Sequence, residues 1–152
     1  MIAFAFLIGI SAGLRALAPI AAVSWAAHLG WLRLEGTWLA FLAAPATAYV
    51  VSALAVAELI GDKLPKTPSR KVPLQFGTRI FSGALCGAAL ATANGAPIVG
   101  LLLGAIGAII GTLGGAAVRA RLAEAFGKDL PAALLEDVVA VGGAILLVSR
   151  FA

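Results

Sequence analysis

The chain has 152 residues, of which 62% are hydrophobic and only 12% are charged, and its formal net charge is +4. Soluble domains are roughly 45–50% apolar and about 25% charged, so this composition excludes an ordinary soluble globule and predicts an integral membrane protein. The one cysteine and the one histidine exclude an internal disulfide and leave no cluster of metal ligands, and we expect no cofactor and no nucleic-acid partner.

The apolar segments predict a single all-α membrane domain over residues 1–152, with about five transmembrane helices. The first segment, 2–28, is long enough to cross a hydrocarbon core of about 30 Å at about 1.5 Å per residue. It has no basic region at its start and Arg15 interrupts it, so we expect a retained helix and not a signal peptide. Pro19 should kink this helix near its middle.

Four further spans follow. The second, 38–61, ends at a polar connection, 62–73, which holds three prolines and four basic residues and is therefore expected to be an extended loop. The third span, 76–93, and the fourth, 98–118, are separated by a tight turn. The fifth span, 132–148, follows a second charged connection.

The fourth span carries glycines at spacings of four, three, four and three residues, which lie along one helical face. They are Gly100, Gly104, Gly107, Gly111 and Gly114. In lipid, a face without side chains lets a neighbouring backbone approach closely, so van der Waals packing replaces the missing hydrophobic drive. We therefore expect this helix to be central and its glycines to serve helix packing rather than to line a pore.

Lysine and arginine are unevenly distributed among the connections. The 62–73 connection contains four basic residues and the 119–131 connection, which we expect to continue the fourth helix, contains three. Only Arg33 and Arg150 lie opposite them. Because basic loops stay in the cytoplasm, five spans put the N-terminus there and the C-terminus outside. The basic connections should attract anionic lipid head groups.

Two short similarities suggest an internal duplication. Residues 58–65 and 124–131 share Glu, Gly, Leu and Pro at equal spacing, and residues 13–15 resemble residues 77–79. This order fits a parallel duplication of a two-helix unit, with the fifth helix added. Chance similarity in a chain rich in Ala, Gly and Leu is the alternative.

Charged side chains within the predicted spans carry the functional argument. Arg15 lies near the middle of the first span, where a lone cation costs at least about 2.5 kcal/mol, so it needs an acidic partner or water. We predict one buried cluster in the cytoplasmic half, formed by Arg15, Glu58, Asp62, Arg79, Glu136 and Asp137. One interpretation is a salt-bridge network that fixes helix register. The other is a cavity for an ion or a small anionic solute, with Arg15 as its contact and a carboxylate that takes up protons.

Several residues also carry a resemblance to a known family. They are Gly13, Leu14, Arg15, Pro19, Gly30, Trp31, Leu32, Glu58, Leu59, Asp62, Lys63, Leu64, Pro65, Thr67, Pro68, Arg70, Pro73, Arg79, Ser82, Gly83 and Ala84. Over nearly its whole length the chain resembles a widespread group of small bacterial multi-pass membrane proteins, catalogued as a domain of unknown function, with relatives in plant plastids. The resemblance implies an integral membrane protein of the bacterial inner membrane and supplies neither a substrate nor a mechanism.

Two functions from different classes remain. The first is a small transporter or channel for a small anionic solute, homo-oligomeric because about five short helices barely enclose a path. It predicts a water-accessible cavity that reaches Arg15. The second is a structural or accessory protein that binds lipid or partner helices through its glycine faces. Catalysis is not expected, because there is no histidine pair and the only thiol, Cys86, lies in an apolar segment.

Overall fold

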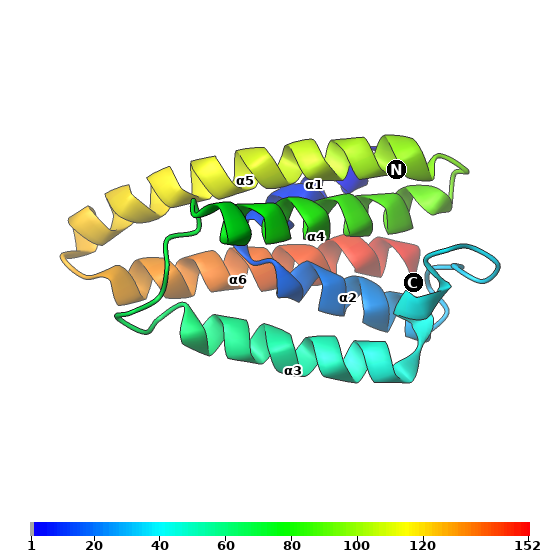
Figure 1. The fold of residues 1–152 in the computed structure, drawn as a ribbon, viewed down its shortest axis with the longest axis horizontal. Helices are drawn as coiled ribbons and strands as arrows, with labels where there is room; N and C mark the ends of the chain where they lie inside the picture. Colours follow the sequence, from blue (N-terminus) through cyan, green and yellow to red (C-terminus); the bar gives the residue numbers. More distant parts are fainter. Residues whose placement is uncertain (1) are drawn as a thin grey trace.

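Helices make up most of the chain and run along one common axis (Figure 1). The computed structural model describes residues 2–152, so Met1 of the predicted 1–152 domain lies outside the described part. These residues contain six α-helices and two short 3-10 helices and no strand, which confirms the all-α prediction. The elements are α1 (Ile2–Leu14), α2 (Leu17–His28), η1 (Ala40–Ala43), α3 (Pro45–Gly61), α4 (Pro73–Thr92), α5 (Pro97–Phe126), α6 (Asp129–Val148) and η2 (Ser149–Phe151).

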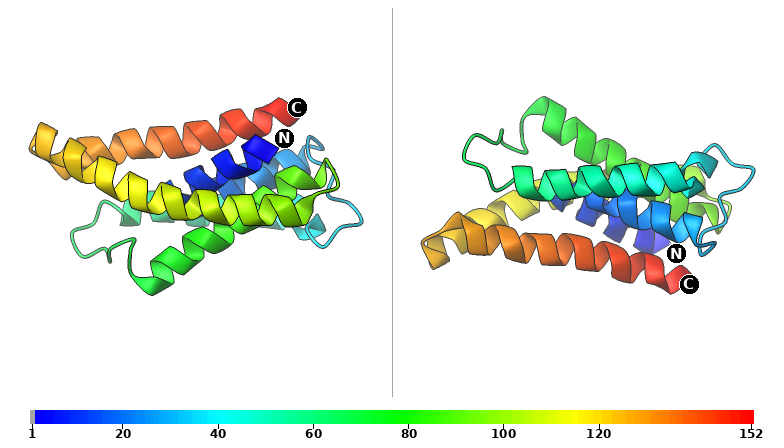
Figure 2. Two further views of the ribbon diagram at one scale, coloured as in Figure 1. Left: turned by 90° about the horizontal axis from the view of Figure 1, so that it is seen from above. Right: turned by 90° about the horizontal axis from the view of Figure 1, so that it is seen from below.

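The predicted single span over residues 2–28 is wrong, because this segment folds into a helical hairpin. α1 starts beside the C-terminus, where the rings of Phe4 and Phe151 pack edge to face with their centroids 6.1 Å apart. The chain turns at Arg15 and Ala16, and α2 then returns toward the end from which α1 started (Figure 1, Figure 2). The apex of this hairpin therefore lies inside the bundle.

Pro19 explains where the turn occurs. A proline lacks the amide that would bond the carbonyl four residues earlier, and its ring clashes with that carbonyl. For Pro19 that carbonyl belongs to Arg15, where α1 has just ended and before α2 begins at Leu17. The expected kink at Pro19 is thus a full reversal of direction that is centred about one helical turn before the proline.

Both chain termini lie at one end of the bundle, and the connections after α3 and α5 lie at the other (Figure 1, Figure 2). The prediction that the N-terminus shares a face with the basic connections is therefore wrong. The reason is the hairpin, which adds one reversal that a single continuous span over 2–28 does not have.

The two helices of the hairpin are short. α1 has 13 residues and α2 has 12, which correspond to lengths of about 20 Å and about 18 Å. A hydrocarbon core is about 30 Å thick, so neither helix is long enough to cross it. α5, with 30 residues, is about 45 Å long and exceeds that thickness.

Three prolines set where the later helices begin. Pro45, Pro73 and Pro97 open α3, α4 and α5, at positions where the missing amide would have no partner in any case. The second predicted span, 38–61, consequently starts too early, because its first residues belong to the connection and to η1. The expected helical continuation beyond residue 118 is confirmed, since α5 runs to Phe126.

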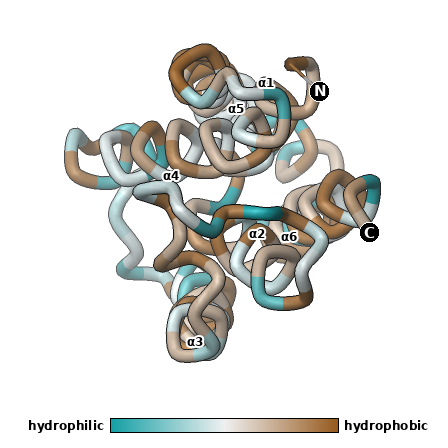
Figure 3. Tube along the Cα trace, turned by 90° about the vertical axis from the view of Figure 1, so that its right-hand side faces the viewer, coloured by the Kyte–Doolittle hydropathy of each residue, from teal (hydrophilic) through white to brown (hydrophobic). Residues whose placement is uncertain are grey.

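Gly104 of α5 lies where three helices meet. A Cβ at this position would overlap the carbonyl of Gly83 in α4, and a Cβ at Gly9 of α1 would overlap the carbonyl of Gly104. Three other predicted packing glycines approach a neighbouring backbone in the same way, Gly100, Gly107 and Gly111. Gly114 has nothing within 4 Å of its notional Cβ. The glycine faces thus hold α1, α4 and α5 at close backbone contact (Figure 3).

The exterior of the bundle is largely apolar. Within residues 2–152, α5 and α6 are the two helices that are long and apolar enough to cross a membrane, and α1, α2 and α3 are shorter apolar helices. Only 33% of the most apolar window of α5, and of α6, is buried. Large exposed side chains on these two helices include Ile98, Leu102, Ile106, Ile110, Leu134, Val138, Ile145 and Leu146. Because the core helix of a soluble protein would bury such side chains, this surface is consistent with a membrane protein.

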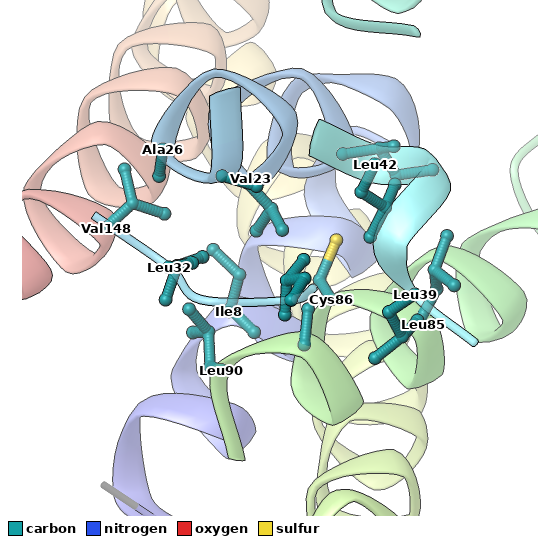
Figure 4. Close-up of a cluster of buried hydrophobic side chains, with 14 of the residues drawn as sticks. Ile8, Val23, Ala26, Leu32, Leu39, Leu42, Leu85, Cys86, Leu90 and Val148 are labelled. Carbon is teal, nitrogen blue, oxygen red and sulfur yellow. The ribbon is translucent and has the colours of Figure 1, made fainter. Parts of the chain in front are cut away.

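The half of the bundle nearest the termini is closed by a packed apolar cluster (Figure 4). Its members come from α1 and α2, from α4, from α6 and from the connection between α2 and α3. They include Ile8, Val23, Leu32, Leu42, Cys86, Leu90 and Val148. Each of these side chains is less than 4% exposed. The hairpin apex is therefore separated from this end of the bundle by tightly packed side chains.

The close approach at Gly104 predicts a position-specific cost for adding a methyl group. Gly104→Ala should destabilise the folded protein by about 1–3 kcal/mol, because the new Cβ has backbone and not a flexible side chain in its way. Unfolding of purified protein in mixed micelles measures this free energy. Gly114→Ala, on the same helix in open space, is the matched control and should cause no loss. Equal effects at the two positions would contradict the packing described above.

Candidate functional site

The turn at the hairpin apex leaves backbone groups without helical partners. Side chains from other helices bond these groups, among them the charged pair Arg79 and Glu58. Nη1 of Arg79 in α4 donates hydrogen bonds to the carbonyls of Gly13, 2.9 Å away, and Leu14, 2.6 Å away. The carboxylate of Glu58 in α3 accepts from the amides of Ala16 and Leu17, each at 2.8 Å. A cation therefore caps the C-terminus of α1 and an anion caps the N-terminus of α2, as the helix dipoles require.

Arg15, at the apex itself, is completely buried and bonds three carboxylates. Its Nε donates to Asp137 at 2.7 Å, its Nη2 to Asp62 at 2.7 Å, and its Nη1 lies 3.4 Å from Glu136. Nη1 also donates to the carbonyl of Leu14 at 2.9 Å. Every nitrogen of this guanidinium thus has a partner, which a buried arginine needs if it is to offset its desolvation.

A second layer of basic side chains neutralises these carboxylates. Arg119 of α5 donates to Asp62 at 2.5 Å and Asp129 at 2.6 Å, and lies 3.2 Å from Glu136. Arg70 pairs with Glu136 through both Nη atoms, and Lys63 pairs with Asp137. The ion pairs include five basic residues and five of the chain's seven acids, so the network is balanced in charge.

The structure brings together the six residues predicted from the sequence. Arg15, Asp62, Glu136 and Asp137 form one directly bonded group. Glu58 and Arg79 form a neighbouring pair, in which Nη2 lies 3.9 Å from Oε1. The two groups are joined through the backbone of the hairpin apex, which both of them contact.

Four participants were not predicted as part of the cluster: Lys63, Arg70, Arg119 and Asp129. Arg119 lies eight residues after Gly111, which puts it about 80° away from that packing glycine around α5, so the glycine spacing gave no clear signal for it. Arg70 belongs to the residues that carry the family resemblance, but it lies in a connection, where spacing does not indicate a direction.

Asp62 stays ionised in this setting. Its burial alone would raise its pKa, but the hydrogen bond from Arg119 and the positive charges of Arg15, Arg119 and Arg70 outweigh the burial and hold the pKa below its usual value. Asp62 is therefore a permanent acceptor between two arginines at neutral pH.

A cavity of about 390 Å³ lies beside the apex, at the end of the bundle that carries the basic connections. Its lining consists of Glu58, Gly61, Asp62, Leu64, Lys66, Thr67, Pro68, Arg70, Gln75 and Arg79. Arg15 is not among them and is 0% exposed. The sequence predicted a cavity that reaches Arg15. The cavity reaches Arg79 instead, because three carboxylates enclose Arg15.

Metal binding has no geometric support in residues 2–152, where no group of three or more His, Cys, Asp or Glu side chains is arranged to hold an ion. Each carboxylate of the network already accepts from an arginine, a lysine or a backbone amide. The arrangement is therefore suited to fixing backbone position and to presenting basic groups to the cavity.

Together these features define a small all-α protein with an apolar exterior, consistent with a membrane location, and a buried network of arginines and carboxylates. The chain belongs to the family described as "Domain of unknown function (DUF4126)", which matches residues 2–150. A search of curated proteins and a search of solved structures each gave no match.

Because every guanidinium nitrogen of Arg15 has an acceptor, we predict a large loss of stability when the charge of this side chain is removed. Arg15→Gln should cost about 3–5 kcal/mol, because three carboxylates lose a buried partner. The free energy of unfolding in mixed micelles measures this effect. Arg121→Gln removes the same charge from an exposed position of α5 and should change the stability by less than about 0.5 kcal/mol. A stable, monodisperse Arg15→Gln protein would contradict the role of the network at the apex.

Proposed function

We propose that this protein is a small multi-pass transporter of the bacterial inner membrane that moves a small polar solute past the apex of the α1–α2 hairpin. The single observation that carries the proposal is the cavity lined by Glu58 and Arg79, the two side chains that bond the backbone at the break between α1 and α2. Irregular backbone at membrane depth is tolerated where it is buried in protein or lines a water-filled cavity, and solute sites of many transporters lie at such broken helices.

The cavity is one-sided, as a transporter with alternating access requires. It is bordered by the connection after α3, while the packed cluster around Leu32, Cys86 and Leu90 closes the half of the bundle toward the termini (Figure 4). Movement of the hairpin relative to α3 and α4 would open the second half. Glu58 and Arg79, which cap the two hairpin helices, are the contacts that such a movement changes first.

The orientation follows from the distribution of basic residues. Lys63, Lys66, Arg70, Lys71 and Lys128 all belong to the connections at one end, so this end faces the cytoplasm by the positive-inside rule. Both termini are then outside the cell.

The surrounding lipid and further copies of the chain are part of the same proposal. The exposed apolar faces of α5 and α6 contact acyl chains, and the basic connections contact anionic head groups. A homo-oligomer would complete the enclosure that six helices, two of them short, provide only in part.

The second candidate is a structural or accessory membrane protein that does not transport. The observation in its favour is Arg15, whose nitrogens all have partners and which no solute reaches in this conformation. The close packing of α1, α4 and α5 at their glycines also suits a rigid scaffold. Flux measurements separate the two candidates.

Transport is tested with purified protein in proteoliposomes, using a panel of small anionic, neutral and cationic solutes. We expect flux of at least one member. Gln75→Cys lines the cavity, and a bulky maleimide attached there should reduce this flux at least about tenfold by filling the path. The native Cys86 is fully buried and should not react.

The matched control is Asn94→Cys, an exposed position at the opposite end of the bundle, where the same label should leave the flux unchanged. If no solute moves, or if the label at residue 75 has no effect on the flux, the transporter proposal fails and the structural candidate takes its place.

The hairpin makes the topology testable in cells. An epitope tag placed before Ile2 should bind antibody on intact spheroplasts, because the N-terminus is outside. Lys66→Cys, in the connection after α3, should react with a membrane-impermeant maleimide only after permeabilisation. A tag that becomes accessible only after permeabilisation would instead agree with a single span over residues 2–28 and would contradict the proposed orientation.

A further inference from the structure

We propose that the cavity beside the hairpin apex binds a small oxyanion, a carboxylate or phosphate group, on the Nε–Nη2 edge of Arg79. This inference names the chemical class of the solute and therefore rests on the proposed function, but the binding site itself can be tested without transport.

Arg79 uses only part of its hydrogen-bonding capacity. Its side chain is 5% exposed, and Nη1 is committed to two carbonyls of α1. Nε is buried and has no hydrogen-bond partner among residues 2–152. Nη2 lies 3.9 Å from Oε1 of Glu58, which is beyond hydrogen-bonding distance. A buried donor without an acceptor costs about 1–3 kcal/mol, so this edge of the guanidinium favours an incoming acceptor.

The unused atoms have the geometry that oxyanions select. A carboxylate or phosphate binds arginine by two parallel N–H···O bonds, and Nε together with one Nη forms such a fork. Arg79 lines the cavity, so an anion entering from the basic end meets its guanidinium. Because Nε is buried, a two-bonded oxyanion requires a small rotation of the guanidinium that exposes this atom to the second oxygen.

The charges around the cavity also favour an anion. Two carboxylates line it, but Glu58 already accepts from two backbone amides and Asp62 already accepts from Arg15 and Arg119. Arg70 is paired with Glu136. The charged lining groups that remain uncommitted are therefore the edge of Arg79 and the ammonium of Lys66, for which no ion pair occurs within residues 2–152.

Binding at this edge is connected to the hairpin. The same guanidinium that would hold the oxyanion holds the carbonyls of Gly13 and Leu14 through Nη1. Glu58, the nearest acid, holds the amides at the start of α2. An anion on Arg79 therefore changes the balance of charge at both capped helix ends, which relates ligand binding to the position of the apex.

The test uses the full-length protein in a zwitterionic detergent and measures the thermal unfolding midpoint against the concentration of sodium phosphate, sodium acetate and sodium chloride at equal ionic strength. Phosphate or acetate should raise the midpoint along a saturating curve, and chloride should not. Arg79→Lys keeps the charge and removes the fork, and should weaken binding at least about tenfold, as expected for loss of a charge-assisted bond.

A second pair of variants keeps the proposal testable if Arg79→Lys does not fold. Lys66→Ala removes a lysine that lines the cavity, and Lys71→Ala removes an exposed lysine of the same connection that does not line it. Both variants lose one positive charge. The apparent dissociation constant should rise about three- to tenfold for Lys66→Ala and less than about twofold for Lys71→Ala.

Three outcomes overturn the assignment. The first is no saturable effect of phosphate or acetate, and the second is an equal effect of the two lysine variants. The third is stabilisation by phosphatidylglycerol vesicles alone, which would give the fork to a lipid head group. Anion binding without flux would leave this site intact and remove the transporter proposal, whereas flux of a neutral or cationic solute without anion binding would do the reverse.

Discussion

The fold depends on how the reversal at Arg15 and Ala16 is stabilised. A broken helix exposes free carbonyls on one side and free amides on the other, and inside an apolar bundle water is not there to bond them. Arg79 and Glu58 bond these groups and also carry the charges that the two helix dipoles favour. The pair could not be exchanged for a neutral one without losing that match. α1, α2, α3 and α4 are thereby tied together at one point.

The glycines make this arrangement sterically possible. α1 packs against α5 only because Gly9 and Gly13 meet the backbone of α5 directly, and α4 approaches the same helix through Gly83 and Gly87. Side chains at these positions would hold the helices apart and would move the carbonyl of Gly13 away from Arg79. Close packing and polar bonding therefore depend on each other at Gly13, whose backbone contacts α5 directly and accepts a hydrogen bond from Arg79.

The sequence predicted the class of the fold and the main members of the polar cluster. Both can be read from short stretches of sequence, namely the length of each apolar segment and the charged residues within it. It failed on the hairpin, because a 27-residue apolar run fits one long helix as well as two short ones. Pro19 cannot donate a hydrogen bond to the carbonyl of Arg15, so the sequence did contain a signal for a helix break at Arg15. Pro45 likewise indicated the start of α3, because proline favours the first position of a helix. Arg70 was beyond reach, because its partner Glu136 is 66 residues away and only the folded connection brings them together. The internal duplication stays a prediction.

Two arginines near one apex thus have different chemistry for a simple reason, the number of acceptors that each one meets. Arg15 faces Asp62, Glu136 and Asp137 and has no donor left, so it can fix structure but cannot select a ligand. Arg79 meets two carbonyls on one edge and a distant carboxylate on the other, so it retains donors beside a cavity. Arg15, which its depth in the sequence singled out, has no donor left for a ligand, whereas Arg79 keeps unpaired donors and lines the cavity. The two arginines are both buried, and they differ in the number of guanidinium donors that have no acceptor.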